Sequence, residues 1–434
     1  MKLTGWGKHP VIDADIIRPQ SRSAVTNLLA DNSEFSGIAR GLGRSYGDSA
    51  LAKKVVSTAF LDHFLSFDDQ TGSLTCAAGV SLDDILQHFV PRGWFLPVTP
   101  GTKFVTVGGA IASDVHGKNH HCEGIFSDYV ISFRLVLPSG DLVTCSRDAK
   151  NALFHATCGG MGLTGIIVDA TFFLKPIKSA YINERTIKAA NLKEVLEFFD
   201  AHEATTYSVA WIDCLATGDK LGRSLLTLGE HAEEGKLDTG KSGALTVPVD
   251  MPGMLLNQYS IQAFNTLYYN RIRKKYTERT IHYEPFFYPL DGIQQWNRMY
   301  GKNGFTQYQF VLPKAAGLEG MTSVLKRIAQ SKRGSFLAVL KAFGKGNDDY
   351  LCFPVEGYTL ALDFKLDKGL FPLLDELDKT VLDYGGRLYL AKDVRMSEAT
   401  FKQSYPRWEQ LAEVRKQYGA DKVFNSLQSE RLGI

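Results

Sequence analysis

Hydrophobic and polar residues repeat with two different periods along this chain, and the periods predict different elements. Ser81 precedes two acidic residues and an apolar face that runs to Val90, which predicts a helix that Ser81 caps and Pro91 ends. Apolar residues within 371–386 also recur at helical spacing, and Gly385 follows near the expected end. Within 129–145, apolar residues alternate around a Pro-Ser-Gly-Asp turn, which predicts a β-hairpin.

Three further runs, within residues 305–310, 336–344 and 358–364, alternate at the period of a strand. This pattern is typical of a sheet with one solvated face, but Lys341 lies between Val339 and Phe343 on its own face. A lysine on an apolar face needs a partner, and an anionic group of a substrate would serve. The residues that would share a face within their strands are Gln307 and Gln309, then Val339, Lys341 and Phe343, then Thr359, Ala361 and Asp363.

Composition restricts the class of protein without identifying it. The chain has 434 residues, which suggests two domains, and 44% of them are hydrophobic. A net charge of +2 argues against a nucleic-acid-binding protein. We find neither an apolar run of membrane-spanning length nor the apolar core of a signal peptide, so we expect a cytoplasmic or membrane-associated protein. Six cysteines without C-x-x-C spacing predict free, buried thiols rather than zinc ligands.

Three glycine clusters, within residues 41–48, 97–121 and 159–165, predict one extended cofactor lying across a domain. The first, GLGRSYGD, combines backbone N–H groups with an arginine, a combination that can hold a pyrophosphate. Its spacing is one residue longer than the Rossmann fingerprint. The second cluster ends in His116, Lys118, His120 and His121. Gly117 and Asn119, which lie between His116 and His120, disfavour the helix that a histidine metal site would need, so we expect no metal here.

The chain resembles the flavin-dependent oxidases of the vanillyl-alcohol-oxidase superfamily, and within it the decaprenylphosphoryl-β-D-ribose 2-oxidase family. The resemblance covers residues 39 to 395, and HGKNHH and RLYLAKD are its most specific parts. The matching stretches are ARGLGRSYGDSA, PVTPGTKFVTVGGAIASDVHGKNHH, GGMGLTGII, WNRMYGKNGFTQYQFVLP and GGRLYLAKDVR.

This resemblance implies an α+β, two-domain fold of the vanillyl-alcohol-oxidase type with an antiparallel-sheet substrate domain. The FAD-binding domain would comprise residues 1–178 and 387–434, and the substrate domain residues 179–386. The residues expected to bind FAD are Ala39, Arg40, Gly41, Leu42, Gly43, Arg44, Ser45, Tyr46, Gly47, Asp48, Ser49, Gly101, Thr106, Val107, Gly108, Gly109, Ser113, Asp114, Val115, His116, Ile167 and Tyr389. Because residues 39–51 contain neither histidine nor cysteine, we expect FAD to be held without a covalent bond.

The implied reaction is oxidation of a sugar hydroxyl, in which a base takes the hydroxyl proton. Period-2 alternation in RLYLAKD would place Leu390 and Lys392 on one face of a strand. Trp211, Phe287 and Arg298 are pocket residues by resemblance alone. The expected catalytic residues are Lys392, His116, Lys118 and Tyr46. The expected substrate-binding residues are Gln307, Gln309, Lys341, Phe343, Trp211, Phe287, Arg298 and Thr359.

In the resembled family the substrate is a polyprenyl-phospho-ribose, oxidised at its 2′-hydroxyl. A partner reductase of the short-chain type then completes epimerisation to the arabinose form, and a quinone is the electron acceptor. The mycobacterial members carry a cysteine where this chain has Ala361, and an asparagine where it has Thr359. These differences leave the shape of the pocket and the exact glycosyl or lipid group open. Two other functions also stay open, an oxidase of soluble alditols or aldonolactones, and a lipid or nucleotide carrier without enzymatic activity.

Residues 251–276 combine Met, Leu, Phe and Tyr with a basic end, Arg271, Arg273, Lys274 and Lys275. They could form a loop that settles on a membrane surface, or an ordinary helix with a solvated basic end.

Overall fold

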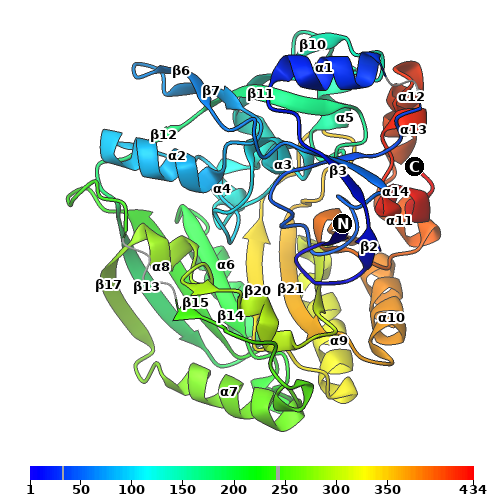
Figure 1. The fold of residues 1–434 in the computed structure, drawn as a ribbon. Helices are drawn as coiled ribbons and strands as arrows, with labels where there is room; N and C mark the ends of the chain where they lie inside the picture. The colour runs from blue at the N-terminus through cyan, green and yellow to red at the C-terminus, as the bar shows by residue number, and fades with distance from the viewer. Residues whose placement is uncertain (32–33, 241–244) are drawn as a thin grey trace.

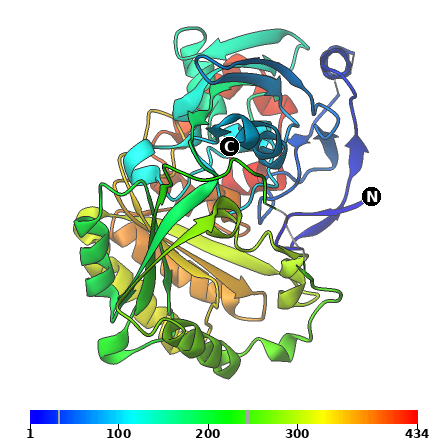
Figure 2. The same ribbon diagram turned by 90° about the vertical axis from the view of Figure 1, so that its left-hand side faces the viewer.

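The computed structural model describes residues 1–31, 34–240 and 245–434, and shows two parts stacked one above the other (Figures 1 and 2). The N-terminal segment, in blue to cyan, and the C-terminal helices, in red, form the upper part in Figure 1. We call this the terminal part. The segment between them, in green to orange, forms the lower part, which we call the middle part. Both chain ends therefore lie in the terminal part.

Two main sheets form the terminal part, one of three strands in the order β3-β5-β4 and one of five in the order β10-β9-β11-β7-β6. The first is parallel and the second antiparallel. The predicted hairpin is confirmed, because β9 pairs with β10 around the turn. The strands are β3 (Asp15–Ile17), β4 (Ile38–Arg40), β5 (Lys54–Ser57), β6 (Phe64–Asp68), β7 (Ser73–Ala77), β9 (Val130–Val136), β10 (Leu142–Ser146) and β11 (Ile166–Phe173). Two short pairs join β1 (Lys2–Thr4) to β2 (Val11–Asp13) and β8 (Trp94–Phe95) to β12 (Lys175–Pro176).

The helix predicted after Ser81 is confirmed as α2 (Leu82–Phe89). Ser81 accepts a hydrogen bond from the Asp84 backbone, and the Asp84 carboxylate accepts one from the Ser81 backbone, so both form a capping box. The other helices of the terminal part are α1 (Arg22–Ala30), α3 (Val107–Ala112), α4 (His120–Glu123), α5 (Asn151–Thr157), α11 (Glu398–Ser404), α12 (Trp408–Gln417), α13 (Ala420–Val423) and α14 (Leu427–Leu432).

An eight-stranded antiparallel sheet, in the order β17-β13-β15-β14-β20-β21-β19-β22, organises the middle part. The three alternating runs are confirmed as the neighbouring strands β19, β20 and β21. The strands are β13 (Tyr181–Ala189), β14 (Tyr207–Ile212), β15 (Ser224–His231), β17 (Tyr276–His282), β19 (Phe305–Pro313), β20 (Ala338–Phe343), β21 (Gly357–Lys365) and β22 (Arg387–Leu388). A small parallel pair joins β16 (Leu245–Thr246) to β18 (Ile293–Gln294).

Helices α9 and α10 cover one face of this sheet. Leu312 of β19 lies against Gly320 of α9, so the alternate residues Gln307 and Gln309 point to the opposite face, away from these helices. The helix predicted over 371–386 is confirmed as α10, with Gly385 in the left-handed conformation just beyond it. The helices of the middle part are α6 (Leu192–Ala201), α7 (Gln258–Asn270), α8 (Tyr283–Phe287), α9 (Gly317–Ser331) and α10 (Leu370–Asp383).

The strand expected through RLYLAKD is wrong beyond Leu388, where β22 ends. Residues 390–392 form a 3₁₀ turn in which the Lys392 N–H donates to the Tyr389 carbonyl. The Gln428 side chain fixes this turn from α14 by donating to the Leu390 carbonyl at 2.8 Å. Tertiary contacts thus override the period-2 pattern.

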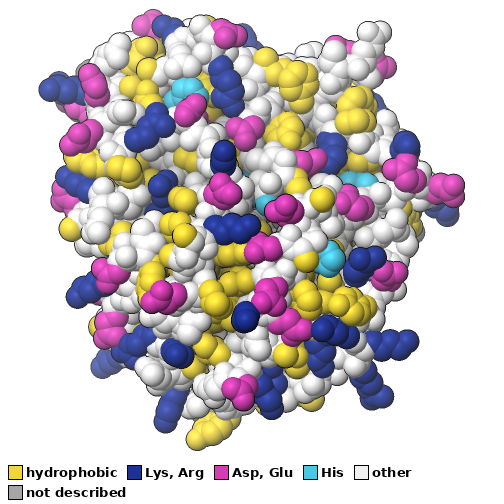
Figure 3. Space-filling model, turned by 180° about the vertical axis from the view of Figure 1, so that it is seen from behind, with side chains coloured by type: hydrophobic (Ala, Val, Ile, Leu, Met, Phe, Trp, Pro, Cys, Tyr) yellow, Lys and Arg dark blue, Asp and Glu magenta, His cyan; other side chains and the backbone are white. Residues whose placement is uncertain are grey.

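Of the two structures considered for residues 251–276, a loop and a helix, the structure contains the helix, α7. No helix within the described residues is long and apolar enough to cross a membrane. All six cysteines carry free thiols, and Cys122, unlike the other five, is exposed rather than buried. On the face that Figure 3 shows, positive and negative side chains are interspersed, in keeping with the small net charge.

Candidate functional site

The glycine-rich segment 41–48 follows β4 directly and leaves a row of backbone donors without partners. Among the described residues, no protein group accepts a hydrogen bond from the N–H groups of Leu42, Gly43, Arg44 and Ser45. Gly43 adopts a positive φ of 64°, and a Cβ on Gly47 would collide with the Asp393 carbonyl. A concave run of free N–H groups fits an anionic group such as a pyrophosphate.

Two charged residues, Arg40 directly before this segment and Asp48 at its end, hold the protein together. Arg40 donates to the carbonyls of Thr4 (2.8 Å) and Ala50 (3.2 Å), which ties the segment to the N-terminal strand. Asp48 pairs with Arg431 of α14 at 2.8 Å, which ties it to the C-terminal helices. Of the two arginines, Arg44 carries the freer guanidinium, stacked over Trp6 at 4.4 Å. We infer that Arg40 and Asp48 shape the segment while its backbone meets the cofactor.

The segment from Thr106 to His116 is the second segment expected to bind the cofactor. Thr106 caps α3 by accepting from the Gly109 backbone at 3.1 Å, and a Cβ on Gly101 would meet nothing within 4 Å. Tyr389 donates to the Ser113 carbonyl at 2.8 Å, which joins this segment to β22 and the turn after it. The other expected cofactor residues lie around these segments. Ala39 is in β4, Ser49 directly follows Asp48, Val107 and Gly108 are in α3, Asp114 and Val115 precede His116, and Ile167 is in β11.

His116 meets the free face of the eight-stranded sheet. The Gln309 amide donates to His116 Nε2 at 3.0 Å, and His116 Nδ1 is buried without a partner among the described residues. Thr359 of the adjacent strand accepts a second hydrogen bond from Gln309, at 3.3 Å, and donates to the Phe310 carbonyl. The His116 ring also packs edge-on against Phe343 at 4.9 Å. Burial, reinforced by the charge of Lys341, holds the pKa of His116 well below its usual value, so this imidazole is neutral.

Three half-buried lysines converge beside His116, and Lys341 lies at their centre. Burial lowers the pKa of Lys341 to about 8, and no hydrogen-bond or ion-pair partner for its Nζ occurs in the described chain. Burial lowers the pKa of Lys118 to about 7, and that of Lys392 to about 7, and the charge of Lys341 adds to both shifts. Lys392 Nζ lies 3.9 Å above the Tyr46 ring, and Lys118 donates to the Phe286 carbonyl. Such a cluster attracts an anion.

Asp363 belongs to this site, although the sequence analysis did not assign it a role. It accepts a hydrogen bond from the Gln307 amide at 2.6 Å. Burial raises the pKa of Asp363 to about 7, against the opposing effects of Gln307 and Lys392. Its position on the same strand face as Thr359 and Ala361 was visible in the alternation of YTLALDF. The alternation does not show that Asp363 is buried, nor that it lies close enough to Lys392 for the charge of each to shift the pKa of the other.

Three further residues were expected around the substrate, and one of them, Phe287, lies beside the cluster, with its ring centroid 5.7 Å from Lys118 Nζ. Phe287 is buried in an aromatic core with Phe95 and Tyr207. Arg298 donates to the carbonyls of Val247 and Pro248, at 3.0 and 2.8 Å.

Trp211 pairs with Val339 of β20, the strand that carries Lys341. Its indole N–H donates to the Phe336 carbonyl at 3.0 Å, and its ring packs against Tyr268 of α7 at 4.7 Å.

Comparison with known proteins agrees with this geometry. Residues 14–146 match the model of a family described as FAD binding domain, and that range contains the first two glycine clusters. Decaprenylphosphoryl-beta-D-ribose oxidase of Mycolicibacterium smegmatis is 38% identical over 450 aligned positions, which cover 100% of this chain and 97% of that protein.

Two other relatives are more distant. An uncharacterized Streptomyces coelicolor protein is 30% identical over 82% of this chain and 100% of its own length. L-gulono-1,4-lactone dehydrogenase of Mycobacterium tuberculosis is 20% identical over 97% of this chain and 96% of its own. The chain thus has the α+β, two-domain FAD-binding fold of the vanillyl-alcohol-oxidase type.

Proposed function

This chain belongs to the decaprenylphosphoryl-β-D-ribose oxidase family and is an FAD-dependent oxidoreductase, and we propose that it oxidises the 2′-hydroxyl of a polyprenyl-phospho-β-D-ribose. The observation that carries the choice of substrate is Lys341, a half-buried cation without a protein partner in the described residues. Burying an uncompensated charge is costly, so the site is complete only when an anion enters. The phosphate of the substrate supplies that anion.

Bound FAD would supply the acceptor for the hydride that the carbinol carbon loses. The segments 41–48 and 106–116 would hold it, through the free N–H groups and the open backbone described above. The protein itself must accept the proton of the hydroxyl group. Lys392, whose pKa is about 7, is substantially neutral at physiological pH and can accept that proton at Nζ. Asp363 then stabilises the resulting ammonium, since its carboxylate raises the pKa of Lys392.

Lys118 and Lys341 are assigned to the phosphate. The charge of Lys341 adds to the lowering of the pKa of Lys118, so the two lysines repel each other. The single negative charge of a phosphodiester between them would reduce that repulsion. Gln309 and neutral His116 are assigned to the sugar, because the hydrogen bond between them fixes the orientation of the Gln309 amide and of the His116 imidazole. Tyr46 supports Lys392 through its ring face.

The deciding experiment is an anaerobic screen for flavin reduction against polyprenyl-phospho-β-D-ribose, free ribose, alditols and aldonolactones. Bleaching of the yellow colour by polyprenyl-phospho-β-D-ribose, and by none of the other compounds, supports the proposal. Bleaching by aldonolactones instead would favour the soluble-sugar alternative, which the distant lactone dehydrogenase relative keeps in view. A protein that binds the lipid and is reduced by no alcohol would be a carrier.

We further propose that FAD is held without a covalent bond, because the pyrophosphate segment contains no histidine or cysteine. Acid precipitation should release the flavin into the supernatant. Colour that remains in the pellet would contradict this, and His116 would be the first attachment site to examine.

The remaining partners are proposed from the family. A short-chain reductase would convert the keto product to the arabinose form, and a quinone would take up the electrons.

We also propose peripheral contact with a membrane through α7 and the turn before it. Three apolar side chains there are strongly exposed, Met254 at 80%, Tyr259 at 79% and Leu267 at 74%, and basic residues follow at 271–275. Apolar side chains beside basic ones are suited to an anionic lipid surface. Because Trp211 packs on Tyr268 of α7, a prenyl chain leaving the sheet face would emerge next to this helix.

Vesicle sedimentation tests the membrane contact. Binding to phosphatidylglycerol vesicles should fall in a Met254→Ser/Leu267→Ser variant. It should persist in Leu318→Ser, which changes an exposed leucine of α9. Equal binding by both variants would contradict the assignment of α7.

A further inference from the structure

A cavity of about 320 Å³ lies at the junction of the two parts and is separate from the site described above. Its walls come from the connection between β20 and β21, from β22, and from the connection between α11 and α12. None of its lining residues is one that we assign to FAD or to the sugar substrate. The volume lies in the range of small-molecule sites. The lining residues used below are Lys345, Asp349, Tyr350, Glu356, Arg387 and Arg407.

Three cations line this cavity, and none forms an ion pair with a carboxylate anywhere in the described ranges of the chain. Arg407 donates to Gln410 through Nε and stacks over Tyr350 at 4.9 Å, which leaves its terminal nitrogens unengaged. Arg387 donates to the Cys352 carbonyl through Nη1 at 2.6 Å, but its Nε is buried without a partner. Lys345 is exposed at the rim.

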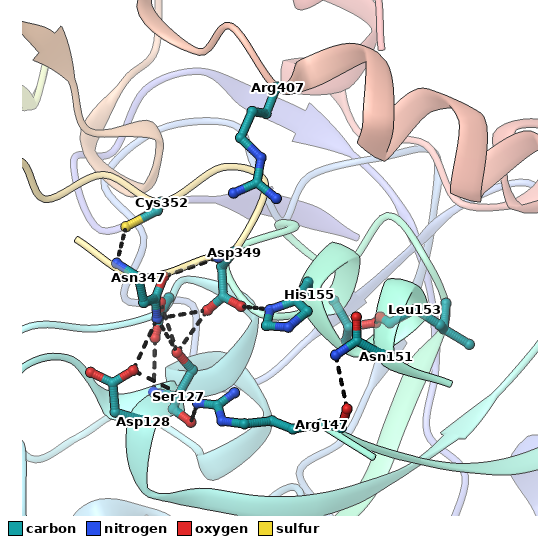
Figure 4. Close-up of polar contacts among 12 residues, drawn as sticks. Ser127, Asp128, Arg147, Asn151, Leu153, His155, Asn347, Asp349, Cys352 and Arg407 are labelled. Atoms are coloured by element: carbon teal, nitrogen blue, oxygen red, sulfur yellow. Dashed lines mark hydrogen bonds and ion pairs between the residues drawn. The ribbon is translucent and has the colours of Figure 1, made fainter. Parts of the chain in front are cut away.

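The carboxylates beside the cavity do not neutralise these cations. Asp349 accepts hydrogen bonds from His155 at 2.7 Å, from Ser127 at 2.7 Å and from Asn347 at 3.0 Å, so its oxygens are engaged within the protein. Figure 4 shows this network below Arg407, whose guanidinium points toward it without an interaction. Glu356 is exposed at the rim and is the remaining negative group. The cavity therefore offers unused N–H donors and an excess of positive charge.

We infer that this cavity is a second binding site, which takes a small phosphate-bearing ligand. A phosphate carries close to two negative charges at neutral pH and accepts several hydrogen bonds, which matches two arginine forks and a lysine better than a single carboxylate does. The connection that forms one wall also carries Phe353, whose ring stacks on Tyr389 at 4.6 Å. A ligand that fixes this connection would therefore be sensed beside the cofactor site.

Calorimetric titration of the FAD-saturated protein with sodium pyrophosphate tests the inference, because bound FAD occupies segment 41–48. We expect one saturable site per chain, and binding at least tenfold weaker in Arg407→Met, the loss expected for one charge-assisted hydrogen bond. Arg92→Met is the matched control, since Arg92 is an exposed arginine that also lies over an aromatic ring and is outside the cavity. Arg387→Met serves as a second probe, with its thermal midpoint recorded because Arg387 also holds Cys352.

Three results would overturn the inference. One is the absence of saturable binding by pyrophosphate and inorganic phosphate. Another is binding that Lys341→Ala abolishes while Arg407→Met leaves it unchanged, which would place the ion in the sugar-phosphate site. The third is arginine-dependent binding of succinate in preference to pyrophosphate, which would assign the cavity to carboxylates.

Discussion

Two lysines near the junction of the two parts, Lys103 and Lys341, have opposite electrostatic surroundings. Lys103 is 3% exposed and forms ion pairs with Asp83 of α2, at 2.9 Å, and with Glu284 of α8. Burial lowers the pKa of Lys103, but these two carboxylates more than offset that effect and raise it above its usual value. Lys341 has no such partner in the described residues, and burial alone lowers its pKa to about 8.

Lys103 therefore has a structural role, whereas Lys341 is available to bind an anionic ligand. Lys103 joins the terminal part to the middle part with all of its charge compensated. Lys341 keeps an uncompensated charge and transmits it to Lys118, His116 and Lys392. Replacing the first should therefore affect stability, and replacing the second should affect binding.

The largest effect is expected for Lys103→Met. The substitution leaves Asp83 and Glu284 facing each other without a cation, and should cost about 3 kcal/mol of unfolding free energy. Urea unfolding of the FAD-bound protein measures this. Lys402→Met, which breaks an exposed pair with Glu398, is the control and should cost less than about 0.5 kcal/mol. Equal stability of the two variants would remove the structural role given to Lys103.

Lys392→Ala should lower the rate of flavin reduction by about two orders of magnitude, because the proton of the hydroxyl group loses its acceptor. FAD should stay bound and the fold should survive, since Lys392 contributes one face-on contact with Tyr46 and no ion pair in the described chain. Anaerobic stopped-flow spectroscopy gives the rate. A variant that retains FAD and is reduced at the normal rate would exclude Lys392 from the reaction and make His116 and Lys118 the next candidates.

Lys341→Ala should raise KM for the phosphorylated substrate by about thirtyfold, the value of one charged contact, with a smaller change in kcat. The thermal midpoint should not fall, because the variant removes a buried charge that has no partner. This result would be the reverse of that for Lys103→Met. A lower midpoint with an unchanged KM would show that Lys341 is structural after all.

Much of the fold follows from local pattern, whereas the roles of single charges do not. The cap at Ser81 and the strands that carry Gln309, Lys341 and Thr359 were predictable, because capping and alternation are properties of neighbouring residues. The pairing of these strands also brings their predicted faces together, since Lys341 lies opposite Thr359 in the register. The domain boundaries at 178/179 and 386/387 stay a proposal, and β22 begins at Arg387 itself.

The partners of single charged side chains could not be predicted from the pattern, because they depend on contacts between distant segments. Lys103 and Glu284 are 181 positions apart, so nothing near Lys103 in the sequence signals its ion pair. Arg40 lies in the cofactor motif, yet its guanidinium is turned to Thr4 and Ala50. Lys392 was expected on a strand, and a side chain from α14 instead places it after a 3₁₀ turn.

The pH dependence of flavin reduction is the smallest of the expected effects, and it tests the electrostatics of the site directly. Only neutral Lys392 accepts a proton, so the rate should rise with pH through about 7, by about tenfold between pH 6 and pH 8. Above about 8, Lys341 loses its charge and substrate binding should weaken, which gives kcat/KM a falling limb that kcat lacks. The Asp363→Asn variant tests whether Lys392 or Asp363 is the base that accepts the proton. Because the Asp363 carboxylate raises the pKa of Lys392, its removal should move the rising limb to lower pH and leave the limb in place. If the limb vanishes in Asp363→Asn and survives in Lys392→Ala, Asp363 is the proton acceptor, and Lys392 supplies only the charge beside it.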